Sequence, residues 1–592
     1  MEHAETARLE DWPWRPWVLA ALLGLAALVV NAAMEWDAAD QEPWRAALAA
    51  FAFFGSLVLA VTLERDRWKA PLAFAGLAGL VMAGIAWRVA SAGDRYAGAE
   101  FWLAAGVVAT GLALPLFQAG FHRLRWRTSY RDTHYHVWTD AISAAGSLAF
   151  LGLSWLLLVL LSELFAAIKI TFLRELMDES WFGWLFSGVA FGAALGTLRN
   201  QLKVIGTLQS VVLLVFSLIA VPFALALTVF LFAVLLSGID VLWDATQSPT
   251  PLLLSCAAAC FVLVNSVARD SDEEASANRV LRIAGLLLAL GILPLAVMAA
   301  ISTGTRIGQY GLSPERIWGL IAVAVAVAYG VAYFVAPIRG RASGWMAGWM
   351  QGVRGANMHL AIGTCVLALI LALPLFDFGA ISARDQIARL QAGKVAADRF
   401  DFDALRWDFG DAGRRALARL AKNPDAQVAA MAKAALAQKQ RVYRYNNFED
   451  GRPAVTDRFA VYPDGAELPD ALRTAIELGE ICRGDVVCRV YLQPDGATAA
   501  VLSDACVPPK FDADAAVEPG RDCSIRVDPY GLRDGQWQYL EAEPPMPSKS
   551  EDEQRAALAR ERRAIEGGDV RVAPSRERQI YIGEEPSGPR FE

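Results

Sequence analysis

The chain carries little charge for its length of 592 residues: Asp, Glu, Lys and Arg make up 20% of it, while apolar residues make up 55%. A water-soluble protein of this size carries more charge, so the composition favours a membrane protein. The net charge of −7 leaves no basic surface for nucleic acid. The acidic N-terminus (Glu2, Glu5, Glu10, Asp11) lacks the basic region of a signal peptide, so we expect the first apolar segment to stay as an anchor.

Familiar catalytic and metal-binding patterns are also missing. The sequence has no Gly-rich phosphate loop, no Gly-x-Ser-x-Gly elbow and no zinc-type cysteine pairs. Residues 377–592 contain no histidine, which removes the commonest general base from that region. We therefore predict no catalytic residues, no metal and no cofactor, and this favours a protein that is not an enzyme.

Long apolar runs are plentiful in residues 1–376. A helix needs roughly 20 apolar residues to cross a hydrocarbon core of about 30 Å. By this criterion we predict about eleven transmembrane helices, at residues 17–34, 44–63, 70–90, 101–122, 141–168, 181–198, 204–236, 251–268, 281–302, 317–336 and 357–376. The span 204–236 contains Pro222, and dividing it there leaves two short pieces, so we predict one kinked helix.

Lys and Arg favour the cytoplasmic side of a membrane in short loops. With the N-terminus inside, the inner segments carry 17 of them: Arg8, Arg15, Arg65, Arg67, Lys69, Arg123, Arg125, Arg127, Arg131, Arg199, Lys203, Arg269, Arg279, Arg282, Arg339, Arg341 and Arg354. The outer segments carry 7: Arg45, Arg88, Arg95, Lys169, Arg174, Arg306 and Arg316. This asymmetry predicts a cytoplasmic N-terminus and a C-terminal region outside, which in the inner membrane of a bacterium means the periplasm.

The segment 181–198 contains Gly188, Gly192 and Gly196 at intervals of four residues. Residues four apart share one helix face, so these glycines form a bare stripe where another helix can approach closely. Long leucine-rich segments flank it on both sides. We expect residues 140–237 to form the packed centre of the membrane domain.

The sequence predicts an all-α polytopic membrane domain followed by a small extracytoplasmic α+β domain. We divide the chain into an N-terminal four-helix segment (1–140), a seven-helix membrane domain (141–376), an amphipathic helical region near the membrane surface (377–440) and a periplasmic α+β domain with a disordered tail (441–592). In the last part, residues 486–491 and 498–502 flank Pro494-Asp495-Gly496, which is typical of a hairpin.

Four of the seven cysteines lie close together in the C-terminal domain: Cys482, Cys488, Cys506 and Cys523. An even number in an oxidising compartment predicts two disulfides. We favour the pairs Cys482–Cys488 and Cys506–Cys523, although four cysteines allow three connectivities. The other three, Cys256, Cys260 and Cys365, fall in predicted membrane helices and are expected to serve as small packing residues.

Three stretches resemble a bacterial inner-membrane family known as domain of unknown function 4153. They are Trp181-Phe182-Gly183-Trp184 with the glycine stripe, residues 306–316 with Tyr310-Gly311-Leu312-Ser313-Pro314-Glu315-Arg316, and residues 381–390. The resemblance covers roughly residues 140–420, and the pattern also fits a sister family numbered 4173. It implies a multi-pass membrane protein and carries no activity with it.

Arg306, Tyr310 and Arg316 fall in an outer loop before the helix that Ser313 and Pro314 can start. The arginines can anchor at lipid phosphates, which we favour, or form an anion-binding pocket. Glu163 lies inside the fifth span, where a charge suggests a pathway or a buried pair; it can also lie near the interface and pair with Lys169.

His122, His134 and His136 fall in one predicted inner loop, and His359 starts the last span on the same side. Alternating histidines can bind a metal on one face of a strand. Four arginines in the same loop would repel a cation, so we favour a plain basic loop.

The large C-terminal region and the lack of catalytic groups favour a membrane protein that presents a periplasmic domain for binding or sensing. Its expected partners are the lipid bilayer and a periplasmic protein or envelope ligand, and not nucleic acid. Two alternatives remain open: a transporter or permease for a small solute, and a membrane-embedded transferase acting on a lipid-linked substrate through Asp240, Asp244 and Arg306.

Overall fold

The computed structural model describes most of the chain. The described residues are 12–34, 42–238, 249–276, 278–339, 348–438, 441, 459–463, 465–478, 488–494, 496–504, 525–533, 536–540, 560, 563, 578–582 and 585–591. They form two compact units, Met1–Ala437 and Gln438–Glu592, which we describe separately.

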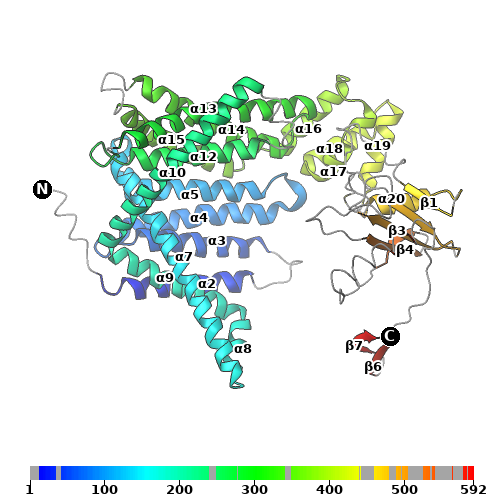
Figure 1. The fold of residues 1–592 in the computed structure, drawn as a ribbon, viewed down its shortest axis with the longest axis horizontal. Helices are drawn as coiled ribbons and strands as arrows, with labels where there is room; N and C mark the ends of the chain where they lie inside the picture. The colour runs from blue at the N-terminus through cyan, green and yellow to red at the C-terminus, as the bar shows by residue number, and fades with distance from the viewer. Residues whose placement is uncertain are drawn as a thin grey trace. The chain divides into compact units, whose positions relative to one another are not determined.

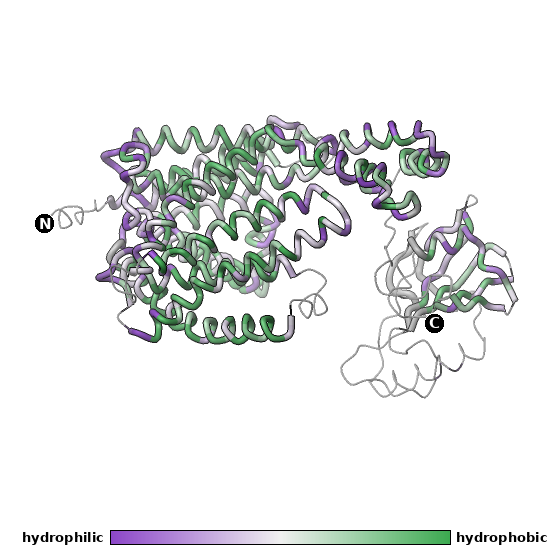
Figure 2. The backbone as a smooth tube through the Cα atoms, turned by 90° about the horizontal axis from the view of Figure 1, so that it is seen from above, coloured by the Kyte–Doolittle hydropathy of each residue, from purple (hydrophilic) through white to green (hydrophobic). Residues whose placement is uncertain are grey.

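The first unit contains the long apolar helices (Figure 1). Within the described residues, eleven helices are long and apolar enough to cross a membrane, which confirms the predicted number. They are α2 (Arg15–Met34), α3 (Pro43–Thr62), α4 (Lys69–Ala92), α5 (Glu100–Gln118), α7 (Tyr130–Ala167), α9 (Ser180–Asn200), α10 (Leu202–Ser237), α12 (Pro249–Ala268), α13 (Arg279–Tyr310), α14 (Pro314–Arg339) and α15 (Gly348–Ala372). Figure 2 shows hydrophobic residues along most of their length and more hydrophilic residues near many of their ends.

Two of these helices begin earlier than predicted. Helix α7 starts at Tyr130, eleven residues before the expected span, and α15 starts at Gly348 instead of residue 357. Ser129 caps α7 by accepting a hydrogen bond from the backbone N–H of Asp132. A count of apolar residues detects only the longest hydrophobic part of a helix, so it missed the polar start of α7 and the start of α15, where glycines, Gln351 and Arg354 interrupt the apolar residues.

Helix α10 is continuous through Pro222, which confirms the single-helix prediction for this segment. Helix α7 is longer still: its 38 residues correspond to roughly 57 Å at 1.5 Å per residue. It runs obliquely across the other helices and continues past them to the short helix α8 (Phe172–Asp178) (Figure 1).

The packed centre of this unit is α13, and the expectation that residues 140–237 form it is wrong. In the most apolar window of α13, 61% of the residues are buried, against 6% in α7 and 17% in α10. Alanines and glycines along α13, such as Ala289, Gly291 and Ala296, let the neighbouring helices approach closely. The leucines of α7 and α10 are largely exposed instead, which suits contact with lipid.

The glycine stripe of α9 lies against the backbone of α2. A Cβ atom on Gly188 or Gly192 would collide with the carbonyl oxygen of Leu23 or Leu19, and one on Gly196 would collide with Pro16. Only glycine therefore permits the contact between these two helices. The stripe packs at the first membrane helix rather than at the centre of the bundle.

A compact layer of short helices follows α15. It consists of α16 (Phe378–Gln391), η5 (Ala397–Arg399), α17 (Phe402–Trp407), α18 (Gly410–Leu420) and α19 (Ala426–Ala437). Phe402, Leu405, Leu417 and Ala432 form its own hydrophobic core. We call this layer the platform.

The platform is fixed to the turn between α4 and α5, where η2 (Gly93–Arg95) lies. Arg414 donates a hydrogen bond to the carbonyl of Asp94 at 2.7 Å and also binds Asp411. The hydrogen bond from Arg414 lowers the pKa of Asp411 below its ordinary value. We call this side of the membrane domain the platform end and the opposite side, where α12 ends and α7 begins, the network end.

The second unit contains a five-stranded sheet, and helix α20 (Asp470–Leu478) shares a hydrophobic core with it. The strands are β1 (Phe459–Tyr462), β2 (Cys488–Leu492), β3 (Thr498–Asp504), β4 (Ile525–Arg533) and β5 (Gln536–Tyr539), in that order across the sheet. Strands β1 and β2 are parallel and the other neighbours antiparallel. The antiparallel pair β2–β3 confirms the predicted hairpin, and Gly496 supplies a positive φ of 66° in its turn.

The last residues differ from the disordered tail that we expected. Strand β6 (Arg578–Ile582) pairs antiparallel with β7 (Glu585–Phe591), which includes the Pro586-Ser587-Gly588-Pro589 stretch. Backbone pairing with a neighbouring strand orders a segment whose composition alone is typical of a loop.

Candidate functional site

The side of α7 that faces the protein is polar. Its buried residues are Thr133, His134, Thr139, Ile142, Ser143, Ser147 and Ser162, of which only Ile142 is apolar. Burying polar side chains in a membrane protein costs free energy, so a helix face that does so marks a candidate functional site. The opposite side of the same helix carries exposed leucines.

At the start of α7, four side chains from four helices form a closed set of hydrogen bonds. Asn357 of α15 donates to the Oδ1 atom of Asn265 on α12 at 2.6 Å, and Tyr333 of α14 donates to Asn357 at 2.6 Å. Asn265 in turn donates to the Tyr333 hydroxyl at 2.8 Å, and Tyr130 of α7 donates to Asn265 at 3.2 Å. We call these four residues the amide–tyrosine network.

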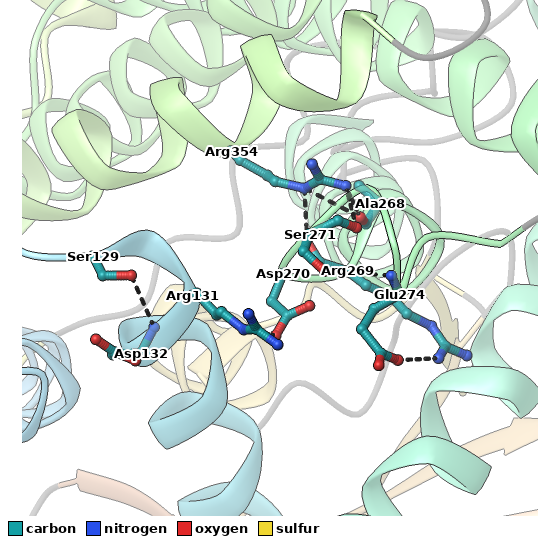
Figure 3. Close-up of polar contacts among 9 residues, drawn as sticks. All are labelled: Ser129, Arg131, Asp132, Ala268, Arg269, Asp270, Ser271, Glu274 and Arg354. Atoms are coloured by element: carbon teal, nitrogen blue, oxygen red, sulfur yellow. Dashed lines mark hydrogen bonds and ion pairs between the residues drawn. The ribbon is translucent and has the colours of Figure 1, made fainter. Parts of the chain in front are cut away.

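Arg354 lies one turn before Asn357 and is only 7% exposed. It donates from Nη2 to the carbonyls of Ala268 and Ser271 at 2.6 and 2.7 Å (Figure 3). Its Nη1 atom donates to Asp272 at 2.6 Å. The last carbonyls of a helix have no partner within the helix, so this arginine satisfies the end of α12. The carbonyls solvate the buried guanidinium group, and the Asp272 carboxylate balances its charge.

Charged pairs surround this arginine at the network end. Arg131 of α7 lies 3.4 Å from Asp270, and Arg269 lies 3.7 Å from Glu274 (Figure 3). The Arg131–Asp270 pair connects α7 to the turn after α12, and the Arg269–Glu274 pair lies within that turn. The network end therefore has a charged rim and, beneath it, the uncharged amide–tyrosine network.

A second polar group lies on another side of α7. Gln118, the last residue of α5, donates from Nε2 to Oδ1 of Asp140 at 3.3 Å and to the carbonyl of Val61 at 3.2 Å. Arg199 of α9 lies near Asp140 and donates to the carbonyl of Ala60 at 2.7 Å. Four helices therefore bring charged and polar groups together around Asp140.

The histidines do not gather at one place. His134 and His136 lie within helix α7, so their placement in a loop or strand is wrong, and a spacing of two turns them to opposite sides of a helix. His134 accepts a hydrogen bond from Trp138 at 3.1 Å, and His359 lies in the middle of α15. Across the part of the chain that the structure describes, no group of three or more His, Cys, Asp or Glu could hold a metal.

The stretches 306–316 and 381–390 are in direct contact, although about 70 residues separate them. Gln386 of α16 donates to the carbonyls of Tyr310 and Leu312 at 2.8 and 3.0 Å, and Asp385 accepts from the N–H of Leu312 at 2.8 Å. Arg389 donates to the carbonyl of Gln309 at 2.7 Å. Side chains of the platform thus satisfy the backbone at the end of α13.

Gly311 makes this approach possible. Its φ is +77°, and a Cβ atom there would collide with side chains of α16. Arg316 donates to the Gly311 carbonyl at 2.8 Å, and the guanidinium groups of Arg306 and Arg316 lie 5.7 and 5.3 Å from the centre of the Tyr310 ring. Arg316 therefore binds the backbone just after the end of α13. The anion-binding pocket stays a prediction.

Glu163 lies in the last turns of α7 and is exposed. Its Oε1 atom is 2.8 Å from Nη2 of Arg174 on α8, so its partner is Arg174 rather than the predicted Lys169. This pair closes the turn between the two helices at the far end of α7. The described residues place it away from the polar groups at the start of the same helix.

Comparison with protein families matches residues 48–420 to the family described as a domain of unknown function (DUF4153). The chain belongs to this family. The match and the eleven long apolar helices together make it a multi-pass membrane protein. No match was found among curated proteins or among solved structures.

The DUF4153 region begins within α3, well before the boundary at residue 140 that we drew from the resemblance. It ends at the last residue of α18. The family region therefore includes both polar groups around α7, the contact between α13 and α16, and most of the platform. The five-stranded sheet lies outside it.

Sequence reasoning missed the residues that carry the network end. Asn265 and Asn357 could have been noticed, because an amide inside or beside an apolar run is unusual in a membrane helix. Arg354 and Asp140 lie just outside the predicted spans; Arg354 enters only the count of inner charges, and Asp140 only as the first residue of the expected centre.

Cys256, Cys260 and Cys365 are free, and Cys260 is fully buried in the core around α13.

Proposed function

We propose that this protein is a membrane-embedded binding or sensing protein that presents its C-terminal α+β domain on the side opposite its N-terminus, the periplasm in a bacterial cell. The observation that carries the proposal is the set of hydrogen bonds between side chains of α16 and the backbone at the end of α13. The chain leading to the C-terminal domain is bound to the membrane helices through Asp385, Gln386 and Arg389. A ligand of that domain could therefore influence the membrane domain.

Helix α13 could transmit the effect of such a ligand through the membrane domain. It runs from the turn after α12 at the network end to the platform, and it is the most buried of the long helices. A rigid element with contacts at both ends can couple two sites, provided that both ends bias the same movement. The permease and transferase alternatives stay predictions; Asp240 and Asp244 of the latter lie outside the described residues.

A pair of reporter fusions tests the orientation. A reporter that is active only in the periplasm should be active when fused after Ala380 and silent when fused at Ser271. The expectation rests on the eleven long helices among the described residues, an odd number, and on the excess of Lys and Arg in the predicted inner segments. Activity at Ser271 would overturn the orientation and the periplasmic domain with it.

Hydrogen exchange of the full-length protein in lipid tests the coupling. Replacing Gln386 and Arg389 together with alanine should speed exchange in the last turn of α13 and also in the turn after α12. Arg384→Ala, an exposed position on the same helix, should change neither region. Faster exchange confined to the platform end would mean that α16 only anchors the platform, and the sensing proposal would lose its support.

A further inference from the structure

The side chains of Asp140 on α7 and Gln118 on α5 are joined by one hydrogen bond. A carboxylic acid and an amide can form two. Gln118 donates from Nε2 to Oδ1 of Asp140 at 3.3 Å and to the carbonyl of Val61 at 3.2 Å. A backbone carbonyl can only accept, so the Val61 contact fixes which end of the Gln118 amide is the nitrogen. The amide oxygen is thereby fixed as well.

The other two atoms of this pair have no partner. Oδ2 of Asp140 and Oε1 of Gln118 are both shielded from solvent, and neither accepts a hydrogen bond. Both are acceptors when Asp140 is ionised, so they cannot bond to each other. A single proton on Oδ2 changes this, because the resulting O–H can donate to Oε1 and complete the second bond of an acid–amide pair.

We propose that Asp140 and Gln118 form a proton-binding site between α7 and α5. A hydronium ion supplies the proton: one of its O–H bonds breaks, a water molecule is released, and the proton binds to Oδ2, which converts the carboxylate to a neutral acid. Binding removes a negative charge from a shielded position and supplies the donor that two buried acceptors lack. Release of the proton leaves both acceptors unpaired and weakens the contact between the two helices.

The charged groups around Asp140 come from several elements. Arg199 of α9 faces it, Arg15 of α2 and the exposed Glu64 after α3 interact with Arg199, and His136 lies on α7 itself. Arg199 favours the ionised form of Asp140, but its Nη1 atom donates to the carbonyls of Ala60 and Leu63. In the described part of the chain, no ion pair within 4 Å joins Arg199 to Asp140, so the proton has no salt bridge to displace.

Infrared difference spectroscopy of the full-length protein in lipid nanodiscs tests the site. Moving from alkaline to acidic buffer should produce a band of a protonated carboxyl group that is present in the wild type and lost in Asp140→Asn. The matched control Asp132→Asn removes an exposed carboxylate from the first turn of the same helix and should keep the band. A spectrum of Asp140→Asn that still contains the whole band would overturn the proposal.

Thermal unfolding gives a second readout. If the folded protein holds a proton that the unfolded chain releases, stability must fall as the pH rises through the titration of the site. The wild type should show this loss, whereas Asp140→Asn, whose amide can donate to Gln118 at every pH, should lack it. If Asp140→Asn does not accumulate, the infrared band of Gln118→Leu decides. This variant removes both hydrogen bonds to the Asp140 acid, so the C=O band of the protonated carboxyl group should move to higher frequency, and an unchanged band position would refute the acid–amide pair.

Discussion

Tyr333 occupies the middle of the amide–tyrosine network. Its side chain is fully buried, donates to Asn357 at 2.6 Å and accepts from Asn265 at 2.8 Å. One hydroxyl therefore links α14 to both α12 and α15. Hydrogen bonds between membrane helices contribute modestly on average, but a buried amide that loses its partner keeps the penalty of its burial.

Tyr333→Phe should destabilise the membrane domain by about 1–2 kcal/mol, because it removes both hydrogen bonds and leaves the shape of the ring unchanged. The free energy of unfolding in detergent, or the midpoint of thermal unfolding, measures the loss. Tyr135→Phe on α7 provides the control, since that hydroxyl takes no part in the network. Equal midpoints for Tyr333→Phe and the wild type would mean that the network does not hold these helices together.

Single residues show where prediction from sequence stops. An unusual polar residue such as Asn265 can be noticed, but its partners Tyr130, Tyr333 and Asn357 are spread over more than 200 positions of the chain. Which of them meet depends on how the helices are arranged, and apolar periodicity carries no information about that arrangement. The same holds for Asp140 and Gln118, which are only 22 residues apart but lie on different helices.

At the scale of elements, the contact between α2 and α9 depends on the absence of side chains at Gly188, Gly192 and Gly196. Gly192→Leu should destabilise the membrane domain by at least about 2–3 kcal/mol, because the new side chain collides with the backbone at Leu19. Even Gly192→Ala should have a measurable effect, since a Cβ atom alone is too large.

The matched control is Gly152→Leu, on α7. Nothing lies within 4 Å of a Cβ atom at Gly152, so a leucine there should be tolerated. Both variants exchange a helical glycine for the same residue, and helix propensity therefore cancels. Equal accumulation and equal resistance to heating in detergent would show that α2 and α9 do not rely on close contact.

Elements were the most predictable level of this structure, for a physical reason. A membrane core of fixed thickness demands about 20 apolar residues per crossing, so each span leaves a clear mark in the sequence. Helix ends leave a weaker mark, because capping stabilises the polar first turn of α7 and contacts such as those of Arg354 stabilise the start of α15. Hydrophobicity also cannot separate a helix surrounded by protein, such as α13, from one surrounded by lipid, such as α7.

At the scale of the whole molecule, the arrangement joins stretches that are remote in sequence. The sequence presents the motif around Tyr310 and the motif around Gln386 as separate stretches, and only the fold shows that they form one contact. The side of the membrane on which the C-terminal domain lies has chemical consequences of its own, because it decides whether its cysteines can form disulfides.

Counting thiols in the full-length protein tests that consequence. Cys488 is buried at the start of β2, while Cys482, Cys506 and Cys523 lie outside the described residues, so the pairing stays a prediction. If the C-terminal domain is exposed to an oxidising compartment, protein purified from membranes and unfolded without reductant should show three reactive thiols, Cys256, Cys260 and Cys365. All seven should react after reduction.

The favoured pairs, Cys482–Cys488 and Cys506–Cys523, can be distinguished from the other connectivities with a single substitution. Cys482→Ser should release one further thiol, that of Cys488, and leave Cys506 and Cys523 unreactive. Release of Cys506 or Cys523 in its place would show one of the other two connectivities. Each bridge closes a short loop and should stabilise the domain by at most about 2–3 kcal/mol. Seven thiols before reduction would rule out both bridges and would favour a reducing compartment for the domain, which the reporter fusions after Ala380 would then have to match.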